Sequence, residues 1–160
     1  MLNQTGNSLV AFSIWPCCPG WLAWSLCEDR MKTLTIKWQR LTNETGQTCD
    51  RCRDTGGTIE TAFKKLQKAL AELGIKTELE STAIDLKEFR KDPLQSNRIW
   101  ISGRPLEEWI GANVGQSRCC SVCGDSECRT ISINKNTFET IPEELIIRAC
   151  LLAAAELFKD

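Results

Sequence analysis

Two groups of cysteines carry the residue types and spacings with which this chain could do chemistry. In the first, Cys49-Asp50-Arg51-Cys52, two thiols one helical turn apart can form a disulfide or chelate one metal ion. The second group is denser and places four cysteines within ten residues, at Cys119, Cys120, Cys123 and Cys128. Within it, Cys120-x-x-Cys123-Gly124 has the form of a metal knuckle, because the glycine lets the chain turn its N–H groups toward sulfur. Both groups indicate thiol chemistry.

Cys119 and Cys120 are expected to have different partners. Adjacent Cα atoms lie ~3.8 Å apart, whereas a disulfide prefers a Cα separation of ~4.4–6.8 Å. The alternative for the second group is a loop stapled by an ordinary disulfide, which a reducing compartment disfavours. Cys150 lies in an apolar stretch and is predicted to be a small buried hydrophobe.

Composition narrows the chemistry further. The chain has no histidine, which excludes Ser-His-Asp and Cys-His catalysis and every metal site that contains histidine. Its 20 basic and 21 acidic residues form no basic stripe, so nucleic acid is not an expected partner. Ten clustered cysteines in 160 residues, enough for one domain with its own core, favour metal or redox use in the cytoplasm.

Residues 1–30 differ in character from the rest. An apolar run from Leu9 to Cys27 is interrupted at Pro16, Pro19 and Gly20, which argues against a membrane span, and it lacks the basic start of a signal peptide. We expect this segment to be a disordered extension or a mis-assigned start. The domain is therefore taken as residues 31–160.

The elements around the first cysteine pair follow from hydrophobic periodicity. Residues 34–38 alternate as a half-buried strand, and a polar loop over 42–57 follows. Seven apolar residues between Ile59 and Leu73 then share one face of an amphipathic helix that ends at Gly74. A second alternating strand from Ile75 completes a βαβ unit.

Shorter elements are predicted beyond this unit. Asp85 caps a short helix, residues 99–101 form a strand, and Pro105 opens a short helix that leads into the cysteine-rich loop. Residues 131–133 form a late strand, followed by a turn at 134–136. A last helix over 140–158 is apolar on most sides, so we expect it to be buried.

Four stretches together resemble a prokaryotic, cysteine-rich, thioredoxin-like family described only as a domain of unknown function, over residues 31–157. They are Leu34-Thr-Ile-Lys-Trp-Gln-Arg-Leu41, Thr48-Cys49-x-x-Cys52, Ser96-Asn-Arg-Ile-Trp-Ile-Ser-Gly-Arg-Pro-Leu-Glu-Glu-Trp109 and Cys119-Cys-x-x-Cys-Gly-Asp-x-Glu-Cys-Arg129. The resemblance implies an α/β, thioredoxin-like fold with a central mixed sheet of four to five strands flanked by helices, and a Cys-rich insertion before a late strand. It implies no substrate. Asn97 departs from thioredoxins, which carry a cis-proline there.

The register of the third strand decides whether the two cysteine groups can meet. If residues 99–101 form that strand, the second group starts at the far end of the sheet and must fold back along its 25-residue connection from Arg104 to Cys128. If residues 129–134 form it, the second group abuts Cys49 directly, as in thioredoxin-like [2Fe-2S] ferredoxins. We prefer the first register because of the Ile101-x-Gly103 pattern.

The first hypothesis is a thiol-based redox protein, a thiol-disulfide oxidoreductase or electron relay with a protein or small-molecule disulfide partner. In it, Cys49 is the exposed attacking thiol, Cys52 is the resolving thiol, and one of the two is unusually acidic. The second group, Cys119, Cys120, Cys123 and Cys128, is then a relay dithiol or a metal site. The rival is a metal-binding protein that holds zinc, a soft metal such as Cu(I), or an iron-sulfur cluster, with the iron-sulfur cluster less expected than zinc. A third alternative is an interaction module in which the cysteines hold a loop.

Overall fold

The computed structural model describes residues 31–119, 123 and 125–159. All of them belong to one compact unit, Met31–Asp160. The predicted extension at residues 1–30 and Cys120 lie outside the described residues. None of the helices in the described part of the chain is long and apolar enough to cross a membrane.

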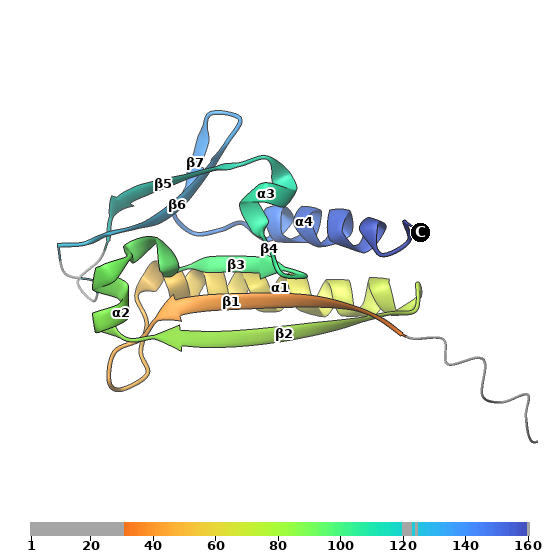
Figure 1. Ribbon diagram of the computed structural model, residues 1–160, viewed down its shortest axis with the longest axis horizontal. Coiled ribbons are helices and arrows are strands. Elements are labelled where there is room, and N and C mark those ends of the chain that lie inside the picture. The colour runs from red at the N-terminus through yellow and green to blue at the C-terminus, as the bar shows by residue number, and fades with distance from the viewer. Residues whose placement is uncertain (1–30, 120–122, 124, 160) are drawn as a thin grey trace, which may run out of the picture. The chain divides into compact units, whose positions relative to one another are not determined.

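A mixed sheet of four strands forms one layer of the unit (Figure 1). Its order is β2 (Ile75–Ile84), β1 (Lys32–Leu41), β3 (Arg98–Ile101) and β4 (Arg104–Pro105). Strand β2 runs parallel to β1, whereas β3 is antiparallel to both β1 and β4. Strand β3 therefore occupies the place that the preferred register assigned to it, and the strand of residues 127–133 does not belong to this sheet.

Helix α1 (Asp50–Ala71) joins β1 to β2 and begins directly after Cys49. The predicted loop over 42–57 was too long, because Gly56 and Gly57 lie inside the helix instead of before it. Gly56 has a packing reason to be there: an added Cβ would lie 2.7 Å from Cη2 of Trp38. The glycine thus allows the first turns of α1 to pack closely on β1.

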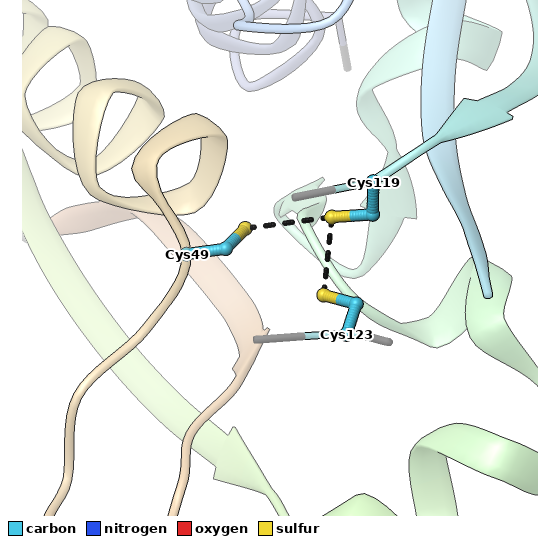
Figure 2. Close-up of side chains that lie close together, drawn as sticks. All are labelled: Cys49, Cys119 and Cys123. Carbon is cyan, nitrogen blue, oxygen red and sulfur yellow. Dashed lines mark hydrogen bonds between the residues drawn. The ribbon is translucent and has the colours of Figure 1, made fainter. Parts of the chain in front are cut away.

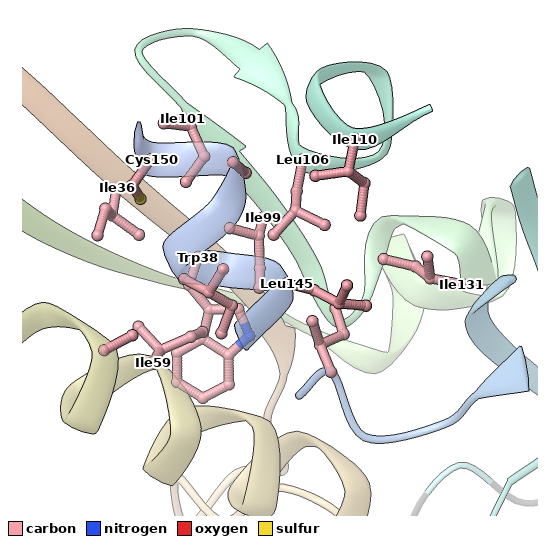
Figure 3. Packing of buried hydrophobic residues seen from close by; sticks show 14 of the residues in the cluster. Ile36, Trp38, Ile59, Ile99, Ile101, Leu106, Ile110, Ile131, Leu145 and Cys150 are labelled. Atoms are coloured by element: carbon pink, nitrogen blue, oxygen red, sulfur yellow. The ribbon is translucent and has the colours of Figure 1, made fainter. Parts of the chain in front are cut away.

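One face of the sheet is covered by α1 and by α4 (Glu143–Glu156). The two helices pack against each other, α1 packs on β2, and α4 packs on β1 and β3. Figure 3 shows the resulting core, in which alternate residues of β1 and β3 meet the buried sides of both helices. Helix α4 is less buried than predicted, since Leu151 and Leu152 are 50% and 41% exposed.

A second sheet of three antiparallel strands carries the late cysteines. It consists of β5 (Asn113–Arg118), β6 (Glu127–Ile133) and β7 (Asn136–Phe138), with β6 in the middle. The turn predicted at 134–136 lies at Asn134 and Lys135, which have positive φ angles of 49° and 70°. Asn136 already belongs to β7, a strand that was not predicted. Strand β5 was missed because its sequence, Asn-Val-Gly-Gln-Ser-Arg, shows no apolar alternation.

Short helices lie between the later strands: α2 (Leu86–Lys91) and the 3₁₀ turn η1 (Pro93–Gln95) separate β2 from β3 of the first sheet, and α3 (Leu106–Ile110) leads from the first sheet into the second. Helix α2 begins as predicted, since the Asp85 side chain accepts a hydrogen bond from the Glu88 N–H at 2.7 Å. The turn η1 then leads into β3, and α3 follows β4. Because α3 ends at Gly111 with φ of 67°, the chain reverses and enters β5.

Candidate metal centre

The two cysteine groups lie close together because the start of α1, which carries the first group, lies near the end of β5 and the start of β6, which carry the second. Cys49 is the N-cap of α1, and Cys52 lies in the first turn of that helix. Cys119 follows the last residue of β5, and Cys128 is the second residue of β6, where it pairs with Ser117. The connection from β4 thus folds back toward α1, as the preferred register required.

The sulfur atoms of Cys49, Cys119 and Cys123 all lie within 4.8 Å of one another. Figure 2 shows Cys119 between the other two, with its sulfur 3.9 Å from that of Cys49 and 3.1 Å from that of Cys123. The sulfur of Cys128 extends this cluster, since it lies 3.4 Å from the sulfur of Cys123. We call these four residues, Cys49, Cys119, Cys123 and Cys128, the thiol cluster.

These distances can be compared with the spacing of ligands around one metal ion. In a tetrahedral zinc site with Zn–S bonds of ~2.3 Å, two sulfur atoms are ~3.8 Å apart. Of the three neighbouring separations in the thiol cluster, the one of 3.9 Å is close to this value, and those of 3.1 and 3.4 Å are shorter. Cys49, Cys119 and Cys123, whose sulfur atoms all lie within 4.8 Å of one another, could therefore hold one metal ion.

Burial sets the cluster apart from a surface dithiol. Cys49, Cys123 and Cys128 are 3%, 4% and 3% exposed, and Cys119 is partly exposed. The expectation that Cys49 is an exposed attacking thiol is wrong, because the strands of the second sheet bring Cys119 and Cys123 against it. Three of the four thiols are therefore shielded from solvent, unlike the partly exposed attacking thiol of a redox dithiol.

The thiols are held in unlike electrostatic environments. The hydrogen bond with Cys49, followed by burial, raises the pKa of Cys52 well above its usual range, so the predicted acidic thiol is not Cys52. Burial foremost raises the pKa of Cys119. The hydrogen bond between Cys123 and Cys128 raises the pKa of Cys123 and lowers that of Cys128, to which the charge of Arg51 also contributes. Among Cys119, Cys123 and Cys128, Cys128 is thus the thiol whose surroundings favour the thiolate.

Arg51 ties the two cysteine groups together. It lies between Cys49 and Cys52 in sequence, and its guanidinium donates to Ser117 Oγ at 2.8 Å and to the carbonyl of Arg118. The same side chain forms an ion pair with Glu139 at 2.9 Å, and Ser117 also donates to Glu139 at 2.9 Å. Since residues 117 and 118 directly precede Cys119, these contacts hold the end of β5 over the start of α1.

On the other side of the cluster, a loop before β3 faces Cys52. Ser96 Oγ accepts a hydrogen bond from the Leu41 N–H at 3.0 Å and lies 3.6 Å from Cys52 Sγ. Asn97, at the position predicted to replace a cis-proline, has a positive φ of 55°. Its buried side chain donates to Thr55 Oγ1 at 3.2 Å and accepts from Trp38 Nε1 at 3.4 Å. Buried side-chain hydrogen bonds therefore fix this loop against α1.

Arg129 anchors the strand that carries Cys128. Its guanidinium forms a buried ion pair with Glu107 of α3, and it also donates to the carbonyl of Leu94 at 3.2 Å. The two side chains are 4% and 10% exposed. A buried arginine next to Cys128 thus joins the second sheet to both α3 and η1.

The structure brings together most, but not all, of the residues singled out from the sequence. Four of the six appear in the thiol cluster, Cys52 lies beside it, and Cys120 is outside the described residues. Sequence reasoning missed the contacts of Arg51 with Ser117 and Glu139. The position of Arg51 inside the CxxC motif could have indicated that this arginine matters, but nothing in the sequence identifies Ser117 and Glu139 as its partners. Cys150 is buried in the core as predicted, and burial raises its pKa to about 12.

Comparisons with known proteins give a family without an assigned activity. The family model described as "Domain of unknown function (DUF2703)" matches residues 34–150. A protein of Archaeoglobus fulgidus, described as uncharacterized, is 43% identical over 113 residues, which cover 71% of this chain and 82% of that protein. No solved structure matches this chain.

Proposed function

Because this chain belongs to the DUF2703 family, whose description assigns no activity, we propose from its geometry that it is a metal-binding protein with one thiolate-ligated ion. The proposed ligands are Cys49 from the first group and Cys119, Cys123 and Cys128 from the second. The observation that carries the proposal is the convergence of these four sulfur atoms, with neighbouring separations of 3.1, 3.4 and 3.9 Å.

The donor set favours zinc. Four sulfur donors without nitrogen or carboxylate oxygen suit a tetrahedral, closed zinc site, and they also suit a soft ion such as Cu(I). An iron-sulfur cluster fits this site less well than zinc or Cu(I). Two irons and their bridging sulfides need more space than there is between cysteine sulfur atoms that lie 3–4 Å apart. Cys120, next to Cys119 in sequence, remains a further candidate ligand.

We also propose that the four-stranded sheet and its helices are thioredoxin-like. The order β2-β1-β3-β4, with only β3 antiparallel to β1, and the two helices on one face support this interpretation. So does the position of the CxxC pair at the start of α1, opposite the Ser96–Asn97 loop. On this scaffold the metal centre would occupy the position of a redox dithiol.

The position of the CxxC pair supports a second candidate function, which is dithiol exchange with a protein or small-molecule disulfide. Cys49 and Cys52 are hydrogen-bonded to each other at the N-terminus of a 22-residue helix, where the helix dipole favours a thiolate. Their burial argues against rapid exchange in the state described here. Either function needs thiols kept reduced, in line with the cytoplasm expected from the cysteine content.

The test is metal content of the full chain purified without oxygen or chelator, with a matched pair of variants. Cys123→Ala removes the sulfur between Cys119 and Cys128, whereas Cys150→Ala makes the same change at a buried cysteine in the core. We expect about one zinc per chain in the wild type and in Cys150→Ala, and much less in Cys123→Ala. Cobalt loading supplies a second readout, because thiolate ligands give intense charge-transfer absorption.

Two outcomes would contradict the proposal. The first is a wild-type chain that binds no metal when zinc, cobalt and Cu(I) are offered separately under reducing conditions. The second is equal metal content in Cys123→Ala and Cys150→Ala. A visible iron-sulfur spectrum in the purified chain would replace the single ion with a cluster.

A further inference from the structure

Resting on the proposed metal centre, we propose that disulfide-bearing oxidants release the metal, because Cys49 serves two mutually exclusive arrangements. In one it is a metal ligand with Cys119 and Cys123. In the other it forms a disulfide with Cys52. The protein would then couple thiol oxidation to metal release, and its second substrate class would be a small-molecule or protein disulfide.

Cys49 is placed to take part in both arrangements. Its sulfur lies 3.9 Å from that of Cys119, and all three sulfur atoms of Cys49, Cys119 and Cys123 lie within 4.8 Å. On the other side, Cys49 is hydrogen-bonded to Cys52, one helical turn away at the start of α1. One sulfur atom cannot keep its metal bond as a thiolate and also enter a disulfide.

Cys52 is the thiol left to resolve the exchange. Among the thiols described at this site, it is the one outside the proposed ligand set. It is 1% exposed, and its sulfur lies 3.6 Å from Ser96 Oγ. With the metal bound, Cys52 remains a thiol outside the ligand set next to Cys49, whereas the described thiols on the other side of Cys49 are ligands.

Cys119 is the point at which a reagent would enter, because it is the partly exposed member of the thiol cluster. Its thiolate attacks the reagent R–S–S–R, which forms Cys119–S–S–R and expels R–S⁻. The Cys49 thiolate then attacks the Cys119 sulfur and expels the second R–S⁻. Finally Cys52, whose proton goes to one R–S⁻, attacks the Cys49 sulfur and restores the Cys119 thiolate.

The sum of these steps is balanced. One Cys49 thiolate, one Cys52 thiol and R–S–S–R give the Cys49–Cys52 disulfide, R–S⁻ and R–SH. The two cysteines are oxidised by two electrons, and the reagent disulfide is reduced by two. Because the metal loses Cys49 as a ligand, its affinity falls, and by linkage the bound metal must equally disfavour the disulfide.

The experiment uses the full chain loaded with Zn²⁺, oxidised glutathione as the disulfide, and a chromophoric chelator that reports released zinc. In the wild type we expect about one zinc released for each Cys49–Cys52 disulfide found by mass spectrometry. At free zinc 100 times its Kd, the equilibrium constant for oxidation should fall about 100-fold. In Cys52→Ser the zinc is retained at the start, and oxidation should stop at a disulfide between Cys49 and Cys119, because the resolving thiol is missing.

The outcomes separate this proposal from the metal centre on which it rests. If the wild-type chain holds no zinc before the oxidant is added, the proposed metal-binding function itself is refuted. Oxidised wild-type chain in which Cys119 is joined to Cys123, with Cys49 and Cys52 still reduced, would overturn the present proposal and leave the metal centre standing. A Cys52→Ser chain that folds but binds no zinc would also overturn it, because Cys52 would then be a ligand.

Discussion

Gly56 and Gly57 provide a paired test of how α1 is seated on the sheet, because they are adjacent in the same helix and differ in what lies beside them. A Cβ at Gly56 would lie 2.7 Å from Cη2 and 3.1 Å from Cζ3 of Trp38. A Cβ at Gly57 would have nothing within 4 Å. Alanine favours the helix over glycine by ~1 kcal/mol at either position, so this gain cancels in the comparison.

What remains in the comparison is the crowding of Trp38, which is 8% exposed and whose Nε1 donates a hydrogen bond to Asn97. Forcing a methyl group into a packed site costs ~1–3 kcal/mol. We therefore expect Gly57→Ala to raise the free energy of unfolding by ~0.5–1 kcal/mol, and Gly56→Ala to lie ~1–3 kcal/mol below Gly57→Ala. The difference arises in the folded state alone.

The assay is urea unfolding followed by far-ultraviolet circular dichroism, with both variants and the wild type under the same reducing conditions. Equal m-values are needed, so that midpoints can be compared as stabilities. If Gly56→Ala proves as stable as Gly57→Ala, Trp38 can move aside freely, and the close packing of α1 on β1 is not what requires glycine at this position.

Three further predictions concern the contacts of Arg51 with β5, the core cysteine Cys150, and the buried ion pair between Arg129 and Glu107. Arg51→Gln should lower the hydrogen-exchange protection of β5 amides about tenfold or more, since hydrogen bonds to a charged group contribute ~1.5–3 kcal/mol. Arg53→Gln, whose side chain is 67% exposed, is the control and should change little. Burial raises the pKa of Cys150 from 9.0 to about 12, so the fold favours the neutral thiol, and stability should fall as pH rises through this window. Cys150→Ala should show a smaller fall in pH-dependent urea unfolding. Arg129→Met leaves the Glu107 carboxylate buried alone and should cost ~3–5 kcal/mol, and adding Glu107→Leu should restore most of it; a double variant no better than the single one would refute this.

The elements that sequence periodicity predicts well are those with a solvent side and a core side. The strand at residues 34–38, the helix face from Ile59 and the strand from Ile75 are all present, because each buries alternate or helically spaced apolar residues. The helix start was predicted too late, since two glycines usually interrupt a helix. Only the nearby ring of Trp38 explains why one of them is needed within α1.

Strand β5 shows the limit of the same reasoning. Its burial pattern is mostly exposed or intermediate, so no apolar alternation marks it, and it exists because β6 supplies hydrogen-bond partners along its length. Without β5, the path that returns Cys119 to Cys49 was not visible. The Ile101-x-Gly103 pattern correctly predicted that residues 99–101 form the third strand. It did not predict that the connection after this strand would bring Cys119 into contact with Cys49.

By itself, the sequence determined which chemistry is available, since ten cysteines without a histidine leave sulfur as the one soft donor, and it placed the first pair at a strand–helix junction. It could not determine that Cys49 would be buried against Cys119 and Cys123. That contact depends on Arg51, Ser117 and Glu139, which are separated by 66 and 22 positions along the chain. Local periodicity reports how each element faces the core, whereas contacts between distant polar side chains arise only when the two sheets pack.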